Sequence, residues 1–360
     1  MRSSAVNGGD VAAAAAAVEQ LKKANRIKPM PRVLVTGATG QQGGATVNAL
    51  LAKGGFEIFA LSRTPESPKA ESLAAKGVRV LKGDFTEPAS LQAALRTSKA
   101  SLVFLVTDFW AAAKQSFDVE VMHGVNMIDA VAAVDPSIFL LYTSVGDADV
   151  VPENVKHFRS KAKVEAHLAA TLTRWSVLRP VSFLDNFDAP GQFNPLTQGT
   201  ASGVTPAGLK MKYIATADIG KAAATVLAAP TKHMKAVHEL ATCEHTGPEI
   251  AAALSEASGT PCTYRPSPPR IVQRFLLPDL YNMVCWFESD GGNYSADPAK
   301  GRALVGPTAL GPKEWFAAKG QWADGRKFGE PAPPSSAVPK ALVATAVIAG
   351  VVAVLYARSK

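Results

Sequence analysis

Short apolar runs and longer amphipathic segments alternate along most of this chain. From about residue 32 to residue 319, the longer segments repeat apolar residues every three or four positions, which is typical of helices with one buried face. Apolar runs between such helices are typical of strands in a parallel sheet covered on both faces. The pattern predicts an α/β fold, a doubly wound parallel sheet, with strands at 32–36, 57–62, 78–82, 101–106, 137–143 and 175–179.

An extension of about 30 residues precedes this pattern. Residues 12–17 are an alanine run that follows Asp10, a residue type that favours helix N-termini, so we predict a short alanine-rich helix within residues 1–30. The extension has no apolar stretch of the length found in secretory signals. Asp10 and Glu19 also argue against an organelle transit peptide.

The end of the chain differs in kind from the alternating part. Residues 326–340 contain four prolines and no apolar run, which predicts an extended linker. Residues 341–357 carry no charge, and a helix of that length spans about 25 Å, close to the roughly 30 Å of a bilayer core. Lys340 and Arg358 flank this segment. We therefore predict a C-terminal transmembrane helix; the alternative is a buried terminal helix of the folded domain.

The position of that segment predicts a cellular location. Only three residues follow residue 357, so the segment would leave the ribosome after synthesis ends, as in tail-anchored proteins. We predict a protein anchored to a membrane by its C-terminal helix, with the folded domain in the cytosol. The mitochondrial, peroxisomal and endoplasmic reticulum surfaces remain open as targets.

Composition and charge narrow the class of protein. A chain of 360 residues that is 47% hydrophobic can bury a large core. The formal charge of +8 permits an acidic partner, but Lys and Arg are scattered, which argues against specific nucleic-acid binding. The three cysteines are odd in number and far apart, so we predict no disulfide framework and no metal site.

The stretch "RVLVTGATGQQGG", residues 32–44, concentrates four glycines between a predicted strand and a predicted helix. In a dinucleotide fold, one such glycine makes the turn, one admits the pyrophosphate, and one lets the helix pack on the strand. The spacing here is G-x-x-G-x-x-G rather than G-x-G-x-x-G. The predicted cofactor-binding residues of this loop are Gly37, Thr39, Gly40, Gln41, Gln42 and Gly43.

Seven stretches, in order along the chain, resemble the NmrA-like family, a branch of the atypical short-chain dehydrogenase/reductases. They are "VTGATGQQGG", "ALSRTPESPKA", "KGDFTEP", "VFLVTDFW", "HFRSKAKVEAHL", "LRPVSFLDN" and "YIATADIGKAA". The resemblance implies a Rossmann-type NAD(P)-binding domain over residues 31–325. Its cofactor part would cover about 31–185, and a smaller C-terminal α/β lobe for a substrate or partner would cover about 186–325.

The end of the second predicted strand selects the nucleotide. NAD sites place Asp or Glu there to bind the ribose hydroxyls, whereas a 2′-phosphate requires Arg. This chain has Ser62 and then Arg63, with Lys69 close by and no carboxylate before Glu66. We therefore predict that Arg63 and Lys69 favour NADP(H) over NAD(H). The alternative is that Arg63 is an exposed loop charge.

The resemblance implies further cofactor contacts at other strand ends. Asp84, with Phe85 beside it, matches the position that contacts adenine in relatives; the alternative is an ordinary turn aspartate. Thr107 ends the fourth strand, where the loop passes the cofactor. Phe183 and Asn186 match the segment beside the nicotinamide, although an aromatic at a strand end is also common in a core.

Short-chain dehydrogenases transfer protons with Ser, Tyr and Lys, the last two spaced four apart on one helix face. The resemblance implies that Ser144 and Lys161 occupy the serine and lysine positions, while His157 stands at the tyrosine position. An imidazole can also pass a proton near neutral pH. The candidate catalytic residues are Ser144, His157 and Lys161, with binding of the nicotinamide ribose as an alternative role for Lys161. Relatives often carry a further lysine where this chain has Met122.

Two functions fit this pattern. The first is a membrane-anchored NADP(H)-binding redox sensor that binds a regulatory partner protein. The second is an NADPH-dependent oxidoreductase that reduces a small carbonyl, enone or quinone substrate. The histidine at the tyrosine position makes us favour the sensor.

Overall fold

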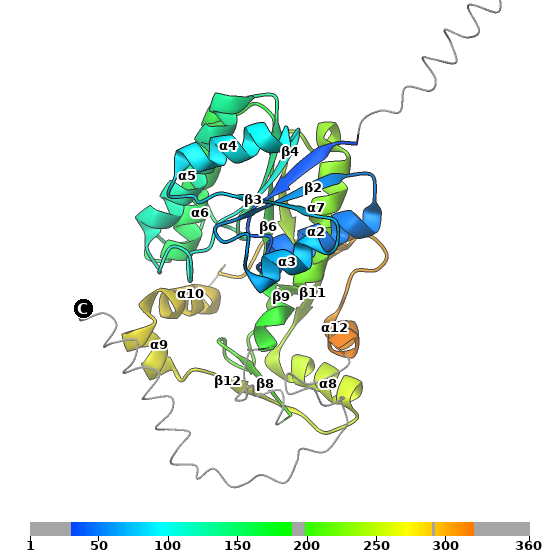
Figure 1. Cartoon of the computed structure of the whole chain (residues 1–360). Helices are drawn as coiled ribbons and strands as arrows, with labels where there is room; N and C mark the ends of the chain where they lie inside the picture. Colours follow the sequence, from blue (N-terminus) through cyan, green and yellow to red (C-terminus); the bar gives the residue numbers. More distant parts are fainter. Residues whose placement is uncertain (1–29, 189–198, 290–291, 320–360) are drawn as a thin grey trace, which may run out of the picture.

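The computed structural model describes residues 30–188, 199–289 and 292–319. Its centre is a parallel sheet, of which Figure 1 labels β2, β3, β4 and β6. The sheet has seven strands in the order β10-β6-β5-β4-β1-β2-β3. The strands are β1 (Arg32–Val35), β2 (Glu57–Ser62), β3 (Arg79–Lys82), β4 (Leu102–Val106), β5 (Phe139–Thr143), β6 (Trp175–Pro180) and β10 (Val237–Leu240). The predicted α/β sheet is confirmed, and the structure adds β10 at its edge.

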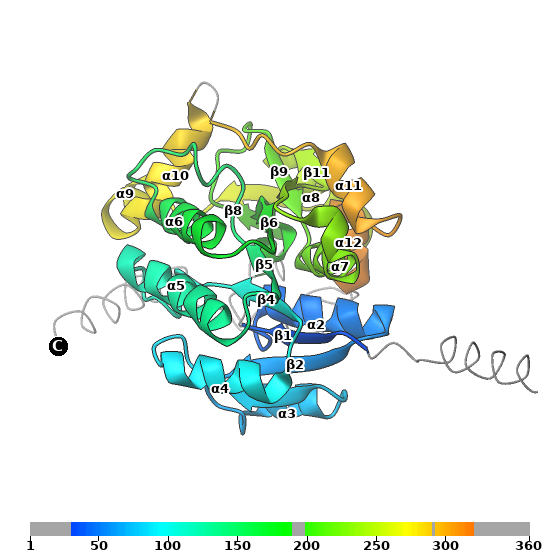
Figure 2. The same ribbon diagram turned by 90° about the horizontal axis from the view of Figure 1, so that it is seen from above.

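Crossover helices cover both faces of the sheet, as Figure 2 shows for α5 and α6 on one side and α2 and α7 on the other. One apolar cluster is formed by side chains on one face of the sheet together with α2 and α7. A second cluster is formed by side chains on the opposite face together with α4, α5 and α6. These helices are α2 (Gln41–Lys53), α3 (Pro68–Ala74), α4 (Pro88–Ser98), α5 (Phe117–Val134), α6 (Lys156–Thr171) and α7 (Thr216–Ala228). Burial on both faces explains why the central strands are apolar throughout.

The chain after β6 builds a smaller lobe beside the carboxyl ends of the central strands (Figure 1). It contains a sheet of order β11-β9-β7 and a pair β12-β8. Its strands are β7 (Ser182–Phe183), β8 (Thr200–Gly203), β9 (Met211–Ile214), β11 (Cys243–His245) and β12 (Thr263–Pro266). Its helices are η1 (Leu184–Phe187), α8 (Gly247–Ser258), α9 (Arg270–Leu276), α10 (Pro278–Glu288), α11 (Pro298–Val305) and α12 (Pro312–Lys319), whereas η3 (Pro230–His233) connects α7 to β10 of the main sheet.

The predicted transmembrane helix requires a correction. Within the described ranges, no helix combines the length and the apolar character that a bilayer crossing needs. The longest of them, α5, has 18 residues and carries three carboxylates, which are costly in a hydrocarbon core. The segment 341–357 lies outside the described residues, as do the predicted N-terminal helix and the linker. We therefore remove the transmembrane helix from the fold class, and with it the membrane-anchored location and the membrane contact that depended on it.

Candidate functional site

A cavity of about 1220 Å³ lies at the carboxyl ends of the central strands, where the smaller lobe meets the main sheet. Strand β1 pairs with β2 on one side and β4 on the other, so the sheet reverses its winding direction there. Ligands of open α/β sheets bind at this kind of switch point. Every predicted site residue except Lys69 lines this one cavity. Lys69 lies on α3 and is exposed, outside the lining.

The glycine loop forms one wall of the cavity. Gly37 has φ +59°, a conformation that favours glycine, and a Cβ on it would lie 2.6 Å from a methyl carbon of Val106. A Cβ on Gly43 would lie 2.2 Å from the carbonyl oxygen of Gly37. Glycine at 43 therefore lets α2 pack directly on the turn that follows β1.

Helix α2 presents its N-terminus to the cavity, and no side chain of the described residues caps it. Its N-cap, Gly40, makes no side-chain capping bond, and its first turn contains no acidic residue. The first N–H groups of such a helix attract an anion. The Gln42 side chain is already engaged, because its carboxamide oxygen accepts a hydrogen bond of 2.7 Å from Thr143 Oγ1. The loop thus fits a pyrophosphate that lies against backbone N–H groups.

The ends of β2 and β3 form the far part of the cavity. Arg63 is exposed and lines it next to Ser62. Asp84 Oδ1 accepts hydrogen bonds of 2.8 Å from both the backbone N–H and the hydroxyl of Thr86. Partial burial raises the pKa of Asp84, but the Thr86 hydrogen bonds outweigh it and leave the pKa below its ordinary value. Asp84 is therefore a turn aspartate and a cavity residue at once.

His123, on the inner face of α5, also lines this part and was missed by the sequence analysis. Its ring stacks on Phe85 with a centroid distance of 5.5 Å. Burial lowers the pKa of His123, so the ring is neutral near pH 7. Among the described residues nothing hydrogen-bonds to its buried Nδ1. An unpaired nitrogen beside an aromatic ring fits the edge and face of a purine base.

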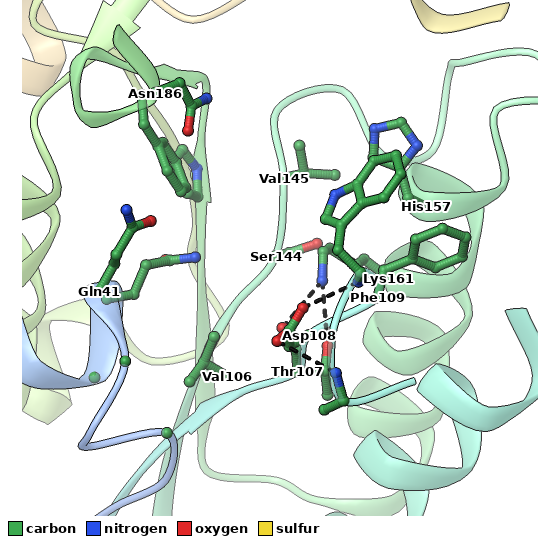
Figure 3. A pocket seen from close by; sticks show the side chains of 18 of the residues that line it. Gln41, Val106, Thr107, Asp108, Phe109, Ser144, Val145, His157, Lys161 and Asn186 are labelled. Carbon is green, nitrogen blue, oxygen red and sulfur yellow. Dashed lines mark hydrogen bonds between the residues drawn. The ribbon is translucent and has the colours of Figure 1, made fainter. Parts of the chain in front are cut away.

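The three candidate catalytic residues come together from two elements. Figure 3 shows Ser144, Lys161 and His157 on one side of the cavity, and Gln41 and Asn186 on the other. Ser144 follows β5, where the chain leaves the sheet, and is 3% exposed. Its Oγ has no hydrogen-bond partner among the described residues, so it is available to a ligand.

A buried polar network holds the Lys161 side chain. Its Nζ donates to Thr107 Oγ1 at 3.2 Å and forms an ion pair with Glu120, which is fully buried on α5. Glu120 also accepts hydrogen bonds from Thr107 Oγ1 at 2.8 Å and from Ser160 Oγ at 2.5 Å. The Tyr142 hydroxyl lies 3.1 Å from Thr107 Oγ1. Glu120 was missed, although a carboxylate on the apolar face of a predicted helix is a usable signal.

His157 lies in the first turn of α6, where aromatic rings surround it. The ring centroids of Phe109 and Trp110 lie 5.7 and 5.1 Å from that of its imidazole. Its Nδ1 contacts the carboxylate of Asp279, which belongs to α10 in the smaller lobe. The sequence analysis missed Asp279, because 122 residues separate the pair.

The lining of the cavity also includes a group of uncharged, mostly apolar side chains, here called the apolar chamber. Phe158 stacks on Tyr294 with a centroid distance of 6.2 Å and an interplanar angle of 14°. The chamber is lined by Phe158, Val204, Thr205, Met211, Tyr213, Leu277, Leu280, Met283 and Tyr294, none of which carries a charge near neutral pH. Burial raises the pKa of the Tyr213 and Tyr294 phenols further above that range.

The segment with Phe183 and Asn186 borders the same chamber. Asp185 fixes it, because its carboxylate accepts hydrogen bonds of 2.8 and 2.7 Å from the backbone N–H and hydroxyl of Thr216, at the start of α7. One end of the cavity therefore has the groups that a dinucleotide needs, and the other has room for an apolar molecule.

Comparison with known proteins agrees with this geometry. The model of the NmrA-like family matches residues 29–305. The chain belongs to the NmrA-like family. The resemblance found in the seven sequence stretches is thereby confirmed.

Relatives of this NmrA-like protein include oxidoreductases. It is 32% identical over 140 residues to the NmrA-like family domain-containing oxidoreductase notA of Aspergillus sp. (strain MF297-2), a match that covers 38% of this chain and 41% of that protein. The chain thus spans about two fifths of that relative's length. It is 30% identical over 237 residues to quinone oxidoreductase 2 of Escherichia coli (strain K12), covering 65% of this chain and 77% of the relative.

Solved structures support the fold. The Escherichia coli quinone oxidoreductase QOR2, complexed with NADPH, superposes with a TM-score of 0.63 at 25% identity, over 80% of this chain and 99% of that one. NmrA, a negative transcriptional regulator in complex with NAD, superposes with a TM-score of 0.64 at 17% identity. That match covers 80% of this chain and 95% of NmrA. The first of these neighbours carries NADPH and the second carries NAD.

Proposed function

We propose that this protein is an NADPH-dependent reductase of an apolar small molecule with a conjugated carbonyl group, such as a quinone or an enone. The observation that carries the proposal is the apolar chamber that continues from the glycine loop past Ser144, Lys161 and His157. A protein that only holds a dinucleotide does not need this additional space. Enzyme sites are typically concave and apolar, with a few convergent polar groups.

Different residues of the chain would bind the cofactor, orient the substrate and supply the proton in such a reduction. When bound, NADPH supplies a hydride. The N-terminus of α2 and the glycine loop would hold its pyrophosphate, and Lys161, oriented by Glu120 and Thr107, would bind the nicotinamide ribose. Ser144 Oγ, which has no partner among the described residues, would donate a hydrogen bond to the substrate oxygen. His157 would supply the proton.

The uncharged chamber selects the substrate class. An ionised substrate group buried there would have no oppositely charged partner in the chamber, so its burial would cost free energy. Flat conjugated rings, by contrast, pack on aromatic side chains such as Phe158 and Tyr294. Similarity to quinone oxidoreductase 2 supports the same class. Steady-state NADPH oxidation with neutral quinones and enones, compared with carboxylated aldehydes of similar size, tests this choice. Equal or faster turnover of the charged compounds would contradict it.

The preference for NADP(H) rests on Arg63. It lies in the lining after β2, where a 2′-phosphate would be bound, and no carboxylate occupies that position. We expect NADPH to bind about tenfold or more tightly than NADH, and Arg63→Glu to remove that preference, because a charge-assisted hydrogen bond contributes about 1.5–3 kcal/mol. Calorimetry with NADPH and with NADH measures the two affinities. Arg96→Glu, at an exposed position on α4 outside the cavity, is the matched control. Equal affinities in the unmodified protein would refute the assignment.

A cofactor-sensing regulator is the second candidate function. The observation that favours it is the ion pair between Lys161 and Glu120, together with His157 at the position where short-chain dehydrogenases carry tyrosine. A regulator would bind NADPH without turnover and would capture a protein partner according to cofactor occupancy. The apolar chamber and the His157–Asp279 pair make the reductase our preferred function, in place of the sensor that the sequence favoured.

A further inference from the structure

One carboxylate of the smaller lobe contacts three groups at the start of α6. Asp279, in the first turn of α10, accepts a hydrogen bond of 2.5 Å from the backbone N–H of Lys156 and one of 3.3 Å from that of His157. It also contacts Nδ1 of the His157 ring. The first two contacts cap a helix that has no cap of its own, since its N-cap is Val155. The third contact has no role in capping.

We propose that Asp279 is a positioning residue that fixes the His157 ring with Nδ1 on the carboxylate and Nε2 on the substrate side, so that Nε2 acts as the proton donor. This inference rests on the proposed reductase function. The side chains of His157 and Asp279 are 10% and 15% exposed, so the pair is shielded from solvent. Among the described residues nothing hydrogen-bonds to Nε2, although the ring lines the cavity.

Packing leaves the ring little freedom to turn away. Phe158 packs edge-on against it at a centroid distance of 4.7 Å, and Phe109 and Trp110 contact it from other directions. A carboxylate at Nδ1 selects the protonated form of that nitrogen and stabilises the ring when both nitrogens carry hydrogen. A ring held in this way presents Nε2–H to the cavity.

The cofactor, His157 and solvent together account for the hydride and the proton that the substrate gains. The substrate gains a hydride, with its electron pair, from the nicotinamide, so the substrate is reduced and the cofactor is oxidised. The Nε2–H bond of the imidazolium breaks as an O–H bond forms on the substrate oxygen. His157 is left neutral, with its Nδ1–H still hydrogen-bonded to the Asp279 carboxylate, and solvent returns one proton to Nε2 before the next turnover.

Because Asp279 belongs to the smaller lobe, the orientation of the proton donor, His157, depends on how this lobe packs against the main sheet. Asp279 belongs to α10, and a neighbour on the same helix, Asn282, donates a hydrogen bond of 2.9 Å to the carbonyl oxygen of Asn154, just before α6. The chain offers a matched pair whose histidine lies on the same helix, α6, and whose aspartate lies on α5. His167 Nε2 lies 2.7 Å from Asp129 on the outer surface, away from the cavity.

A double-mutant cycle on the full chain tests the proposal. Asp279→Asn keeps an acceptor for the helix cap but removes the charge at Nδ1; we expect it to lower kcat for NADPH-dependent reduction of 1,4-naphthoquinone on the order of 10–10³-fold. The Kd for NADPH should not change. In a His157→Ala background the same substitution should cost nothing further, because Asp279 acts through His157. Asp129→Asn is the control and should leave kcat unchanged. Equal losses in both backgrounds, or no loss in either, would overturn the proposal.

A spectroscopic measurement separates this inference from the reductase function. The chain has six histidines, so ¹⁵N-histidine labelling gives a spectrum in which His157→Ala identifies the resonances of residue 157. We expect Nδ1 to carry a proton in the unmodified protein, and Asp279→Asn to change the tautomer or to permit exchange between tautomers. A fixed Nδ1–H without turnover would refute the reductase and uphold the positioning by Asp279. A ring that is insensitive to Asp279→Asn would refute the positioning, whatever the activity.

Discussion

Replacing His157 with alanine is expected to lower kcat for NADPH-dependent quinone reduction by on the order of 10²–10⁴-fold, the usual range for a lost general acid. The NADPH affinity should barely change, because the pyrophosphate and ribose contacts that we propose lie on the glycine loop and Lys161, which line the cavity. Steady-state kinetics and calorimetry on the same preparations separate the two effects.

The control for this substitution lies on the same helix. His167 is also paired with an aspartate but does not line the cavity, so His167→Ala should retain full activity. If His157→Ala were as active as the unmodified protein, another group would have to donate the proton. Ser144, whose Oγ lines the cavity without a partner among the described residues, would then be the candidate.

Replacing Gly43 with alanine is expected to remove most of the NADPH affinity. The added Cβ would lie 2.2 Å from the carbonyl oxygen of Gly37 and 2.6 Å from that of Thr36, and backbone atoms cannot yield as a flexible side chain does. Overpacking of this kind costs about 1–3 kcal/mol, so we expect the free energy of unfolding to fall by that amount. Because α2 must shift away from the loop, we also expect the Kd for NADPH to rise roughly 10–100-fold.

Gly208→Ala is the matched control for Gly43→Ala. A Cβ at position 208 would meet nothing within 4 Å, and that glycine does not line the cavity. Thermal unfolding with and without NADPH measures both stability and binding. A Gly43→Ala protein that is stabilised by NADPH as strongly as the unmodified chain would contradict the role of this glycine.

The parts of the site that the sequence predicted depend on local geometry. The loop from Gly37 to Gly43 forms between one strand and the next helix, so its glycines report directly on the turn and on the close packing of α2. Ser144 and Thr107 follow strands whose apolar runs are visible in the sequence. The carboxyl ends of parallel strands meet at one edge of a sheet, which brings these residues together.

The residues that the sequence analysis missed depend on contacts across the fold. Glu120 contacts Lys161 although 41 positions separate them in the sequence, and Asp279 contacts His157 although 122 positions separate them. No local sequence pattern predicts either contact. The strand β10 was missed for a different reason. Its sequence, Val-His-Glu-Leu, is half polar because it forms the sheet edge, where Val237 is 44% exposed.

In two predictions, those for Lys69 and for the transmembrane helix, a local property of the sequence was given a role that depends on the whole structure. Lys69 is close to Arg63 in sequence, but it lies on the exposed side of α3 and does not reach the cavity lining. The apolar segment 341–357 was interpreted from its hydropathy, its flanking charges and the proline-rich linker before it, and the described structure contains no helix able to cross a membrane. Apolar character shows that a segment avoids water, and it does not specify what covers it.

Multiple-turnover oxidation of NADPH by the purified full chain, followed with 1,4-naphthoquinone as acceptor, tests the central claim most directly. We expect each protein molecule to oxidise many equivalents of NADPH, and His157→Ala to abolish nearly all of this activity while the variant still binds the cofactor. A folded protein that binds NADPH but oxidises at most one equivalent with every neutral quinone and enone would contradict the reductase and favour the regulator.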